Sequence, residues 1–93
     1  MTLKEYVHEI LECDYSVIEY FRIDNGRNSF TAKIDGHWNV IGDGVLKGVV
    51  GFGNTKEDAL EDLIETIRGQ KITNNGHSRC RNEINVPSSL TLE

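Results

Sequence analysis

Acidic side chains recur within one short stretch of the chain, at spacings that could support acid–base chemistry or binding. They are Asp58, Glu61, Asp62 and Glu65. Steps of three and four residues place them along the outer face of a helix. Carboxylates that catalyse proton transfer usually need burial or a cleft to separate their pKa values, and a solvated helix face offers neither. We therefore expect either a solvated face or a docking surface for a basic partner, and no catalytic residue.

Nucleophiles and metal ligands are scattered along the sequence. The three histidines, His8, His37 and His77, fall in separate segments with no nucleophile motif beside them. His77 and Cys80 are close enough to share a metal ion, but zinc takes four ligands, usually from two such pairs. Cys13 is the remaining thiol, and it has no ligand partner at a suitable spacing. The pattern predicts no metal site and no hydrolase triad.

Two glycine-rich runs are candidates for phosphate-binding loops. The run at residues 42–48 does not fit G-x-G-x-x-G, because its third glycine comes one residue late. The run at residues 51–56 lies between a strand and a helix start, where backbone amides can hold an anion, but it lacks Walker-loop spacing. Glycine as a conformational break explains both runs. We expect no cofactor, and a protein that is not an enzyme.

Charge is unevenly distributed along the chain. The net charge is −5, and residues 1–69 hold seven Lys and Arg against 13 Asp and Glu. Nucleic-acid binders neutralise phosphates with basic patches, so this balance makes nucleic acid an unlikely partner and permits a basic protein. Trp38, Tyr15, Tyr20 and Phe30 could stack on single-stranded bases, although core packing is the more ordinary role of strand aromatics.

The expected location is cytoplasmic. Two cysteines do not make a disulfide framework, and both are interpreted as free thiols in a reducing compartment. No apolar run reaches the roughly 20 residues of a membrane helix, and charged residues near the N-terminus argue against a signal peptide.

Local patterns in the first half predict a helix and two strands. Thr2 and Glu5 form a capping-box pattern before apolar residues at helical spacing, which predicts a helix over about 3–12. Residues 15–23 are rich in β-branched and aromatic types, and a second strand is expected over 28–35. Asn25-Gly26 between them is typical of a tight hairpin turn.

The second half predicts a further strand and a second helix. Residues 37–41 are expected to form a short strand or to continue the previous one, and 45–48 a loop with an apolar anchor. Residues 49–52 are expected to be a strand. Asn54 or Thr55 would cap a helix with an apolar face, and Gly69 would end it.

These elements predict an α+β domain in the order α-β-β-β-α. An antiparallel sheet of three or four strands would carry both helices on one face. Residues 1–69 would form this single domain, and residues 70–93 a polar C-terminal extension with a short edge strand at 84–87. Exposed sheet edges would also allow a homodimer by strand pairing.

The stretch from Tyr15 to Ile67 resembles the HicB-like antitoxin fold. That family carries a Gly-x-Gly-x-Thr-x-Glu-[Glu/Asp]-Ala-Leu signature, and Gly51–Leu60 matches it. A Pro-Ser element often follows the helix, as Pro87-Ser88 does here. The resemblance implies a non-enzymatic module that neutralises a small basic ribonuclease toxin by contact. The residues expected to bind such a partner are Asp58, Glu61, Asp62 and Glu65.

The chain departs from that family in its N-terminal helix and has no room for the C-terminal DNA-binding domain that is often present. With that helix included, the order also resembles a double-stranded-RNA-binding domain. Lys56-Glu57-Asp58 stands where that domain usually has a basic run, which implies a degenerate module whose remaining affinity would rest on Arg27, Lys47 and Lys56. A third interpretation is an acidic inhibitor of a host nucleic-acid enzyme, as small phage-type proteins often are.

Overall fold

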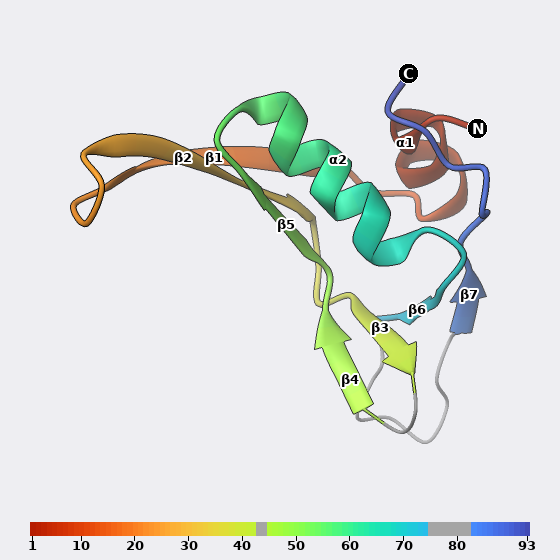
Figure 1. The fold of residues 1–93 in the computed structure, drawn as a ribbon. Helices are drawn as coiled ribbons and strands as arrows, with labels where there is room; N and C mark the ends of the chain where they lie inside the picture. Colours follow the sequence, from red (N-terminus) through yellow and green to blue (C-terminus); the bar gives the residue numbers. More distant parts are fainter. Residues whose placement is uncertain (43–44, 75–82) are drawn as a thin grey trace.

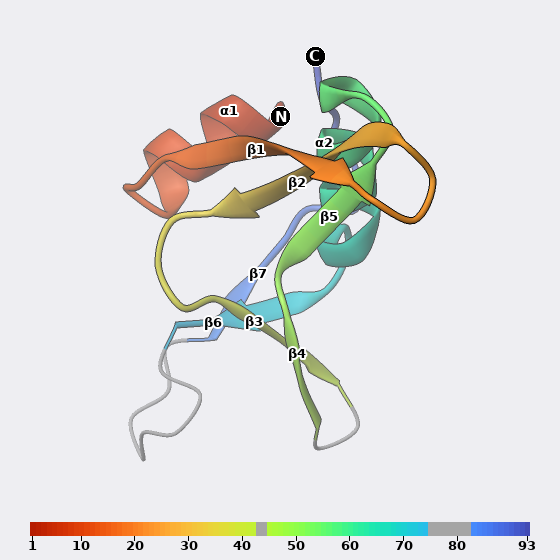
Figure 2. The same ribbon diagram turned by 90° about the vertical axis from the view of Figure 1, so that its left-hand side faces the viewer.

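The computed structural model describes residues 1–42, 45–74 and 83–93, and it has a mixed α+β architecture with antiparallel sheets and two helical segments (Figure 1). Seven strands form a three-stranded sheet in the order β1-β2-β5 and a four-stranded sheet in the order β4-β3-β6-β7. The prediction of a single sheet of three or four strands was therefore wrong, because it omitted the second sheet. The two sheets lie at different levels of the molecule, and β5 follows directly from β4 (Figure 2).

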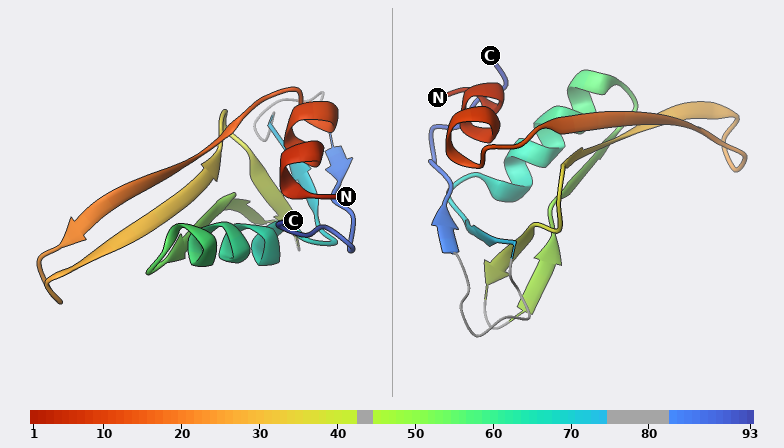
Figure 3. Two further views of the ribbon diagram at one scale, coloured as in Figure 1. Left: turned by 90° about the horizontal axis from the view of Figure 1, so that it is seen from above. Right: turned by 180° about the vertical axis from the view of Figure 1, so that it is seen from behind.

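The three-stranded sheet is built on a long hairpin. It consists of β1 (Tyr15–Arg22), β2 (Arg27–Ile34) and β5 (Val50–Gly53). Asn25 Oδ1 accepts a hydrogen bond from the Arg27 amide at 3.0 Å, and Gly26 has a φ of 65°. A hairpin turn at Asn25-Gly26 is therefore confirmed, but Arg22 pairs with Arg27, so the connection is a four-residue loop over 23–26 and not a tight two-residue turn. Gly26 alone of the pair has a positive φ, which glycine adopts without steric cost. The outer part of the hairpin projects beyond β5 and α2 (Figure 3).

Helix α2 (Lys56–Ile67) crosses one face of this sheet. The Thr55 hydroxyl caps it by accepting a hydrogen bond from the Asp58 amide at 3.0 Å, which decides between the two expected caps. Gly69 follows the helix with a φ of 69°, as a C-terminal glycine does.

The second sheet is small and joins distant parts of the chain. Its strands are β3 (Asn39–Gly42), β4 (Val45–Gly48), β6 (Lys71–Thr73) and β7 (Glu83–Asn85). The expected loop at residues 45–48 was wrong, because these residues pair with β3 as a strand. The edge strand expected at residues 84–87 is present as β7, which covers 83–85. Residues 43–44 and 75–82 lie outside the described residues.

The N-terminal helix is capped as the sequence predicts. Thr2 Oγ1 accepts from the Glu5 amide at 3.2 Å, and Glu5 Oε1 accepts from the Thr2 amide at 3.2 Å. One helical turn, α1 (Leu3–Glu5), continues into a wider π-helical segment, η1 (Tyr6–Ile10). The helix ends before Glu12, whose φ is 54°, two residues earlier than expected.

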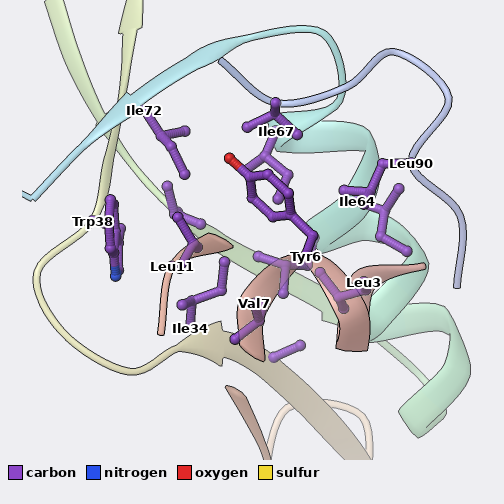
Figure 4. Close-up of a cluster of buried hydrophobic side chains, with 14 of the residues drawn as sticks. Leu3, Tyr6, Val7, Leu11, Ile34, Trp38, Ile64, Ile67, Ile72 and Leu90 are labelled. Atoms are coloured by element: carbon purple, nitrogen blue, oxygen red, sulfur yellow. The ribbon is translucent and has the colours of Figure 1, made fainter. Parts of the chain in front are cut away.

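The core gathers side chains from both ends of the chain (Figure 4). Tyr6 packs among apolar side chains of α2 and the C-terminal segment, and its hydroxyl donates to the Asn85 carbonyl at 3.3 Å. The Leu3 amide donates to the Thr91 carbonyl at 2.7 Å, so the two terminal segments are paired. Residues 70–93 were expected to be a polar extension, yet Ile72 and Leu90 are fully buried in this core.

Candidate functional site

The outer surface of α2 carries the acidic residues, and its inner surface determines how close the helix lies to the sheet. A Cβ atom added to Gly51 would stand 2.3 Å from the Ala59 carbonyl oxygen and from the Leu63 amide nitrogen. Neither Gly51 nor Gly53 has a positive φ. These glycines are therefore needed for close approach of the helix backbone, and the expected role as a conformational break was wrong for this pair.

All four predicted partner-binding residues are exposed, and their spacing of three and four residues keeps them on one outer face of α2. The margin towards β5 carries Asp58 and Asp62: the Cβ of Asp58 is close to Gly53, and Asp62 Oδ2 accepts from the Phe52 amide at 2.9 Å. Glu61 and Glu65 line the margin towards the C-terminal segment. The two margins of this acidic face therefore meet different neighbours.

A groove of about 500 Å³ separates α2 from the C-terminal segment, and Glu61 and Glu65 line it. Glu57 joins them one turn earlier, and Glu93 faces them from the opposite wall. Apolar side chains contribute to the same walls, namely Ile64 and Leu92. The groove thus combines carboxylates with apolar surface, which matches the methylene stem and charged head of lysine or arginine.

Arg68 links the two sides of this groove, α2 and the C-terminal segment. Its Nε donates to the Leu90 carbonyl at 3.1 Å, and its side chain forms a 2.8 Å ion pair with Glu65 Oε1. Arg68 therefore neutralises Glu65 and fixes the C-terminal segment against α2. Glu57 and Glu61 form no ion pair within the described part of the chain, so they keep an unbalanced negative charge.

Sequence reasoning missed Glu57, Arg68 and Glu93 as members of this site. Glu57 could have been found, because it precedes Glu61 by one helical turn and belongs to the same row as Glu65. No local pattern indicates that residues 91–93 pack beside α2, since that contact joins segments far apart in sequence.

The reactive side chains are dispersed. No group of three or more His, Cys, Asp or Glu side chains in the described residues could hold a metal ion, and the pair His77 and Cys80 lies outside that part. Burial, followed by the charges of Asp35 and Asp14, raises the pKa of the Cys13 thiol, which disfavours the nucleophilic thiolate. His8 Nε2 lies 2.8 Å from Asp14 Oδ1, and His37 belongs to a different part of the fold.

The aromatic residues considered for base stacking do not share a surface. Trp38 is buried, and its Nε1 donates to the Asp35 carbonyl at 3.0 Å, while Tyr15 and Phe30 pack against the core. Only Tyr20 of this set is exposed. The basic residues of the RNA-binding interpretation are also separated, with Arg27 in the hairpin, Lys47 in β4 and Lys56 at the start of α2 (Figure 1).

Comparison with known proteins gives no relative for this arrangement. No protein-family model, curated protein or solved structure matches the chain. Within the described residues, no helix is both long enough and apolar enough to cross a membrane.

Proposed function

We propose that this domain is a non-catalytic protein-binding module that holds a basic segment of a partner protein in the groove between α2 and the C-terminal segment. The observation that carries the proposal is the row of Glu57 and Glu61, exposed and free of ion pairs among the described residues, beside an apolar wall. A lysine or arginine of the partner would lay its stem on the partly exposed Leu92 and its charge against these carboxylates.

The partner class to test first follows from the HicB-like signature at Gly51–Leu60. A small basic ribonuclease of the toxin type would be neutralised when its basic surface is covered by this domain. The binding residues in this proposal are Glu57, Glu61 and Glu65, with Asp58 and Asp62 contributing charge from the adjoining part of the same exposed helix face. We place such an encounter in the cytoplasm.

A binding titration with one charge reversal tests the proposal. The variant Glu61→Lys should weaken binding of a small basic ribonuclease by roughly tenfold or more, because it places a cation against the partner's basic segment. The matched control is Glu9→Lys, which makes the same charge change at an exposed position on the N-terminal helix. Equal loss in both variants would show that only net charge matters, and the groove would not be the site.

The same titration at high salt gives a second measurement. Binding that depends on exposed carboxylates should weaken as the Debye length falls from about 10 Å at 0.1 M salt to about 3 Å at 1 M. Salt-independent binding would contradict the electrostatic mechanism. Binding of duplex RNA that survives in both variants would instead favour the nucleic-acid interpretation.

A further inference from the structure

The two edges of the three-stranded sheet differ in how their backbone groups are satisfied. At the β5 edge, the Phe52 amide donates to Asp62 Oδ2, so α2 closes that edge. At the β1 edge, none of the described elements runs alongside most of the strand (Figure 3). Natural sheets protect such edges with lysine, proline or bulges, and β1 contains no Lys, Pro or Gly.

The hydrogen-bond pattern shows which residues of β1 face outward. The Asp35 amide donates to the Asp14 carbonyl at 2.8 Å, which makes this pair a hydrogen-bonded one. Because antiparallel ladders alternate, the even-numbered residues of β1 bond to β2 and the odd-numbered ones point away. The backbone groups of Tyr15, Val17, Glu19 and Phe21 are therefore open to another strand.

We propose that the domain forms a two-fold symmetric dimer in which β1 pairs antiparallel with β1 of a second copy, centred on Ile18. A two-fold axis normal to the sheet places residues of the same face opposite one another. An axis at Ile18 sets Tyr15 opposite Phe21 of the second copy, and Val17 opposite its Glu19.

Neighbouring registers are less favourable. An axis at Glu19 would set this carboxylate directly against its own copy, and like charges opposite one another destabilise a strand pair. An axis at Val17 or at Tyr20 would pair fewer residues of β1. The Ile18 register avoids both costs.

A groove on the helix side of the sheet receives the second copy in this register. The groove has a volume of about 470 Å³ and lies between β1 and the first turns of α2, with Tyr15, Val17, Leu60 and Lys56 among its lining residues. Phe21 is 61% exposed and would place its ring beside Tyr15 of the other copy. Because each copy supplies one Phe21 ring and one groove, the two-fold symmetry forms the same ring-to-groove contact twice.

The charged side chains at this groove are also complementary in the Ile18 register. Glu19 of the second copy would lie opposite Val17, on the wall of the groove that also carries Lys56. Neither Glu19 nor Lys56 forms an ion pair within the described residues. Pairing would bring this carboxylate and this amine together twice across the two-fold axis.

The exposed apolar area is sufficient for such an interface. Ile18, Tyr20 and Phe21 of β1 are between 39% and 61% exposed. Taking a large side chain as about 150–250 Å², they present roughly 300 Å² per copy. A standard interface buries about 800 Å² per partner, of which about 60% is apolar, so these side chains supply most of the apolar share.

Analytical ultracentrifugation of wild type and two variants tests the dimer. Glu19→Pro removes an outward-facing donor without touching the β2 ladder, and should weaken dimerisation by roughly 100-fold. The matched control is Ile23→Ser, which removes a 91% exposed apolar side chain beyond the paired residues and should leave dimerisation unchanged. A wild type that is monomeric at all concentrations, or a dimer unaffected by Glu19→Pro, would overturn the proposal.

A disulfide trap decides the register even if the proline variant fails to fold. In a Cys13→Ser, Cys80→Ser background, Ile18→Cys would face its own copy at a non-hydrogen-bonded pair, with Cα atoms about 4.5 Å apart. Rapid oxidation to a covalent dimer is expected there, and slow oxidation for the exposed control Ile23→Cys. Equal rates would overturn the Ile18 register. The acidic groove shares only Glu57 with this surface, so loss of one interaction does not remove the other.

Discussion

The two faces of the three-stranded sheet use opposite kinds of residue. The face beneath α2 presents Gly51, Gly53 and the fully buried Ala32. The other face presents Ile18, Tyr20 and Phe52, which are all exposed. Small residues are buried where a helix backbone lies close, and large apolar residues are exposed where none of the elements that the structure describes covers them. In this sheet, side-chain hydrophobicity alone does not indicate burial.

The difference has a physical cause on each side. Beneath α2, the volume between helix and sheet is filled by Ala59 and Leu63 from the helix, so the strand must contribute almost none. On the open face, exposed aromatic and aliphatic side chains remain in contact with water unless another molecule covers them. The first face stabilises the fold, and the second is available for association.

The largest effect is expected from adding one methyl group on the helix face. Gly51→Ala places a Cβ 2.3 Å from backbone atoms of α2, so the helix must shift, at a cost of about 3 kcal/mol or more. Urea denaturation measures the free energy of unfolding. The control is Gly48→Ala, where a Cβ would meet no atom within 4 Å and a loss below about 1 kcal/mol is expected. Similar losses for both variants would show that α2 does not lie this close to β5.

Removing a large side chain from each face sharpens the comparison. Leu63→Ala, at a fully buried position, should cost about 3 kcal/mol of stability through lost burial and cavity formation. Phe52→Ala, at a 56% exposed position, should cost less than about 1.5 kcal/mol. These values apply to the monomer, so the denaturation is best done at low protein concentration. A larger loss for Phe52→Ala would mean that the open face is covered within the monomer.

The smallest predicted effect compares two tyrosines by alkaline titration. Burial raises the pKa of Tyr6 to about 12, against about 10 in an unfolded chain. A raised pKa means that the folded state holds the Tyr6 proton more tightly than the unfolded state does. The stability that Tyr6 contributes is therefore intact below about pH 10 and is lost between pH 10 and 12. The expected loss is about 2 kcal/mol at the upper end.

Two phenylalanine variants serve as the test of that pH dependence. Tyr6→Phe should remove most of the decline between pH 10 and 12, at the cost of the hydrogen bond to the Asn85 carbonyl. Tyr20→Phe changes a 39% exposed tyrosine and should leave the decline in place. A decline that persists in Tyr6→Phe would assign it to another group.

Features of this fold were predictable from the sequence when the contacts that form them join residues close together in the chain. The cap at Thr2, the cap at Asn54 or Thr55, and the position of the hairpin turn at Asn25-Gly26 were correctly predicted, because each depends on residues no more than three apart. The strand at residues 45–48 was missed because it is polar at one end and has no apolar alternation, and it becomes a strand only by pairing with β3. The acidic surface was recognised, but the neighbours at its two margins depend on where β5 and residues 91–93 lie.

The sequence by itself determined the local structure: capped helices, a hairpin that turns at Asn25-Gly26, an apolar side of α2 and an acidic surplus. Each of these arises from interactions within a few residues, where side-chain type and spacing are sufficient. Only the tertiary structure decided that the strands divide into two sheets, and that residues 70–93 supply part of the core. It also decided that Gly51 and Gly53 serve close helix packing. These features depend on which distant segments meet, and many pairings of short strands satisfy the same local pattern.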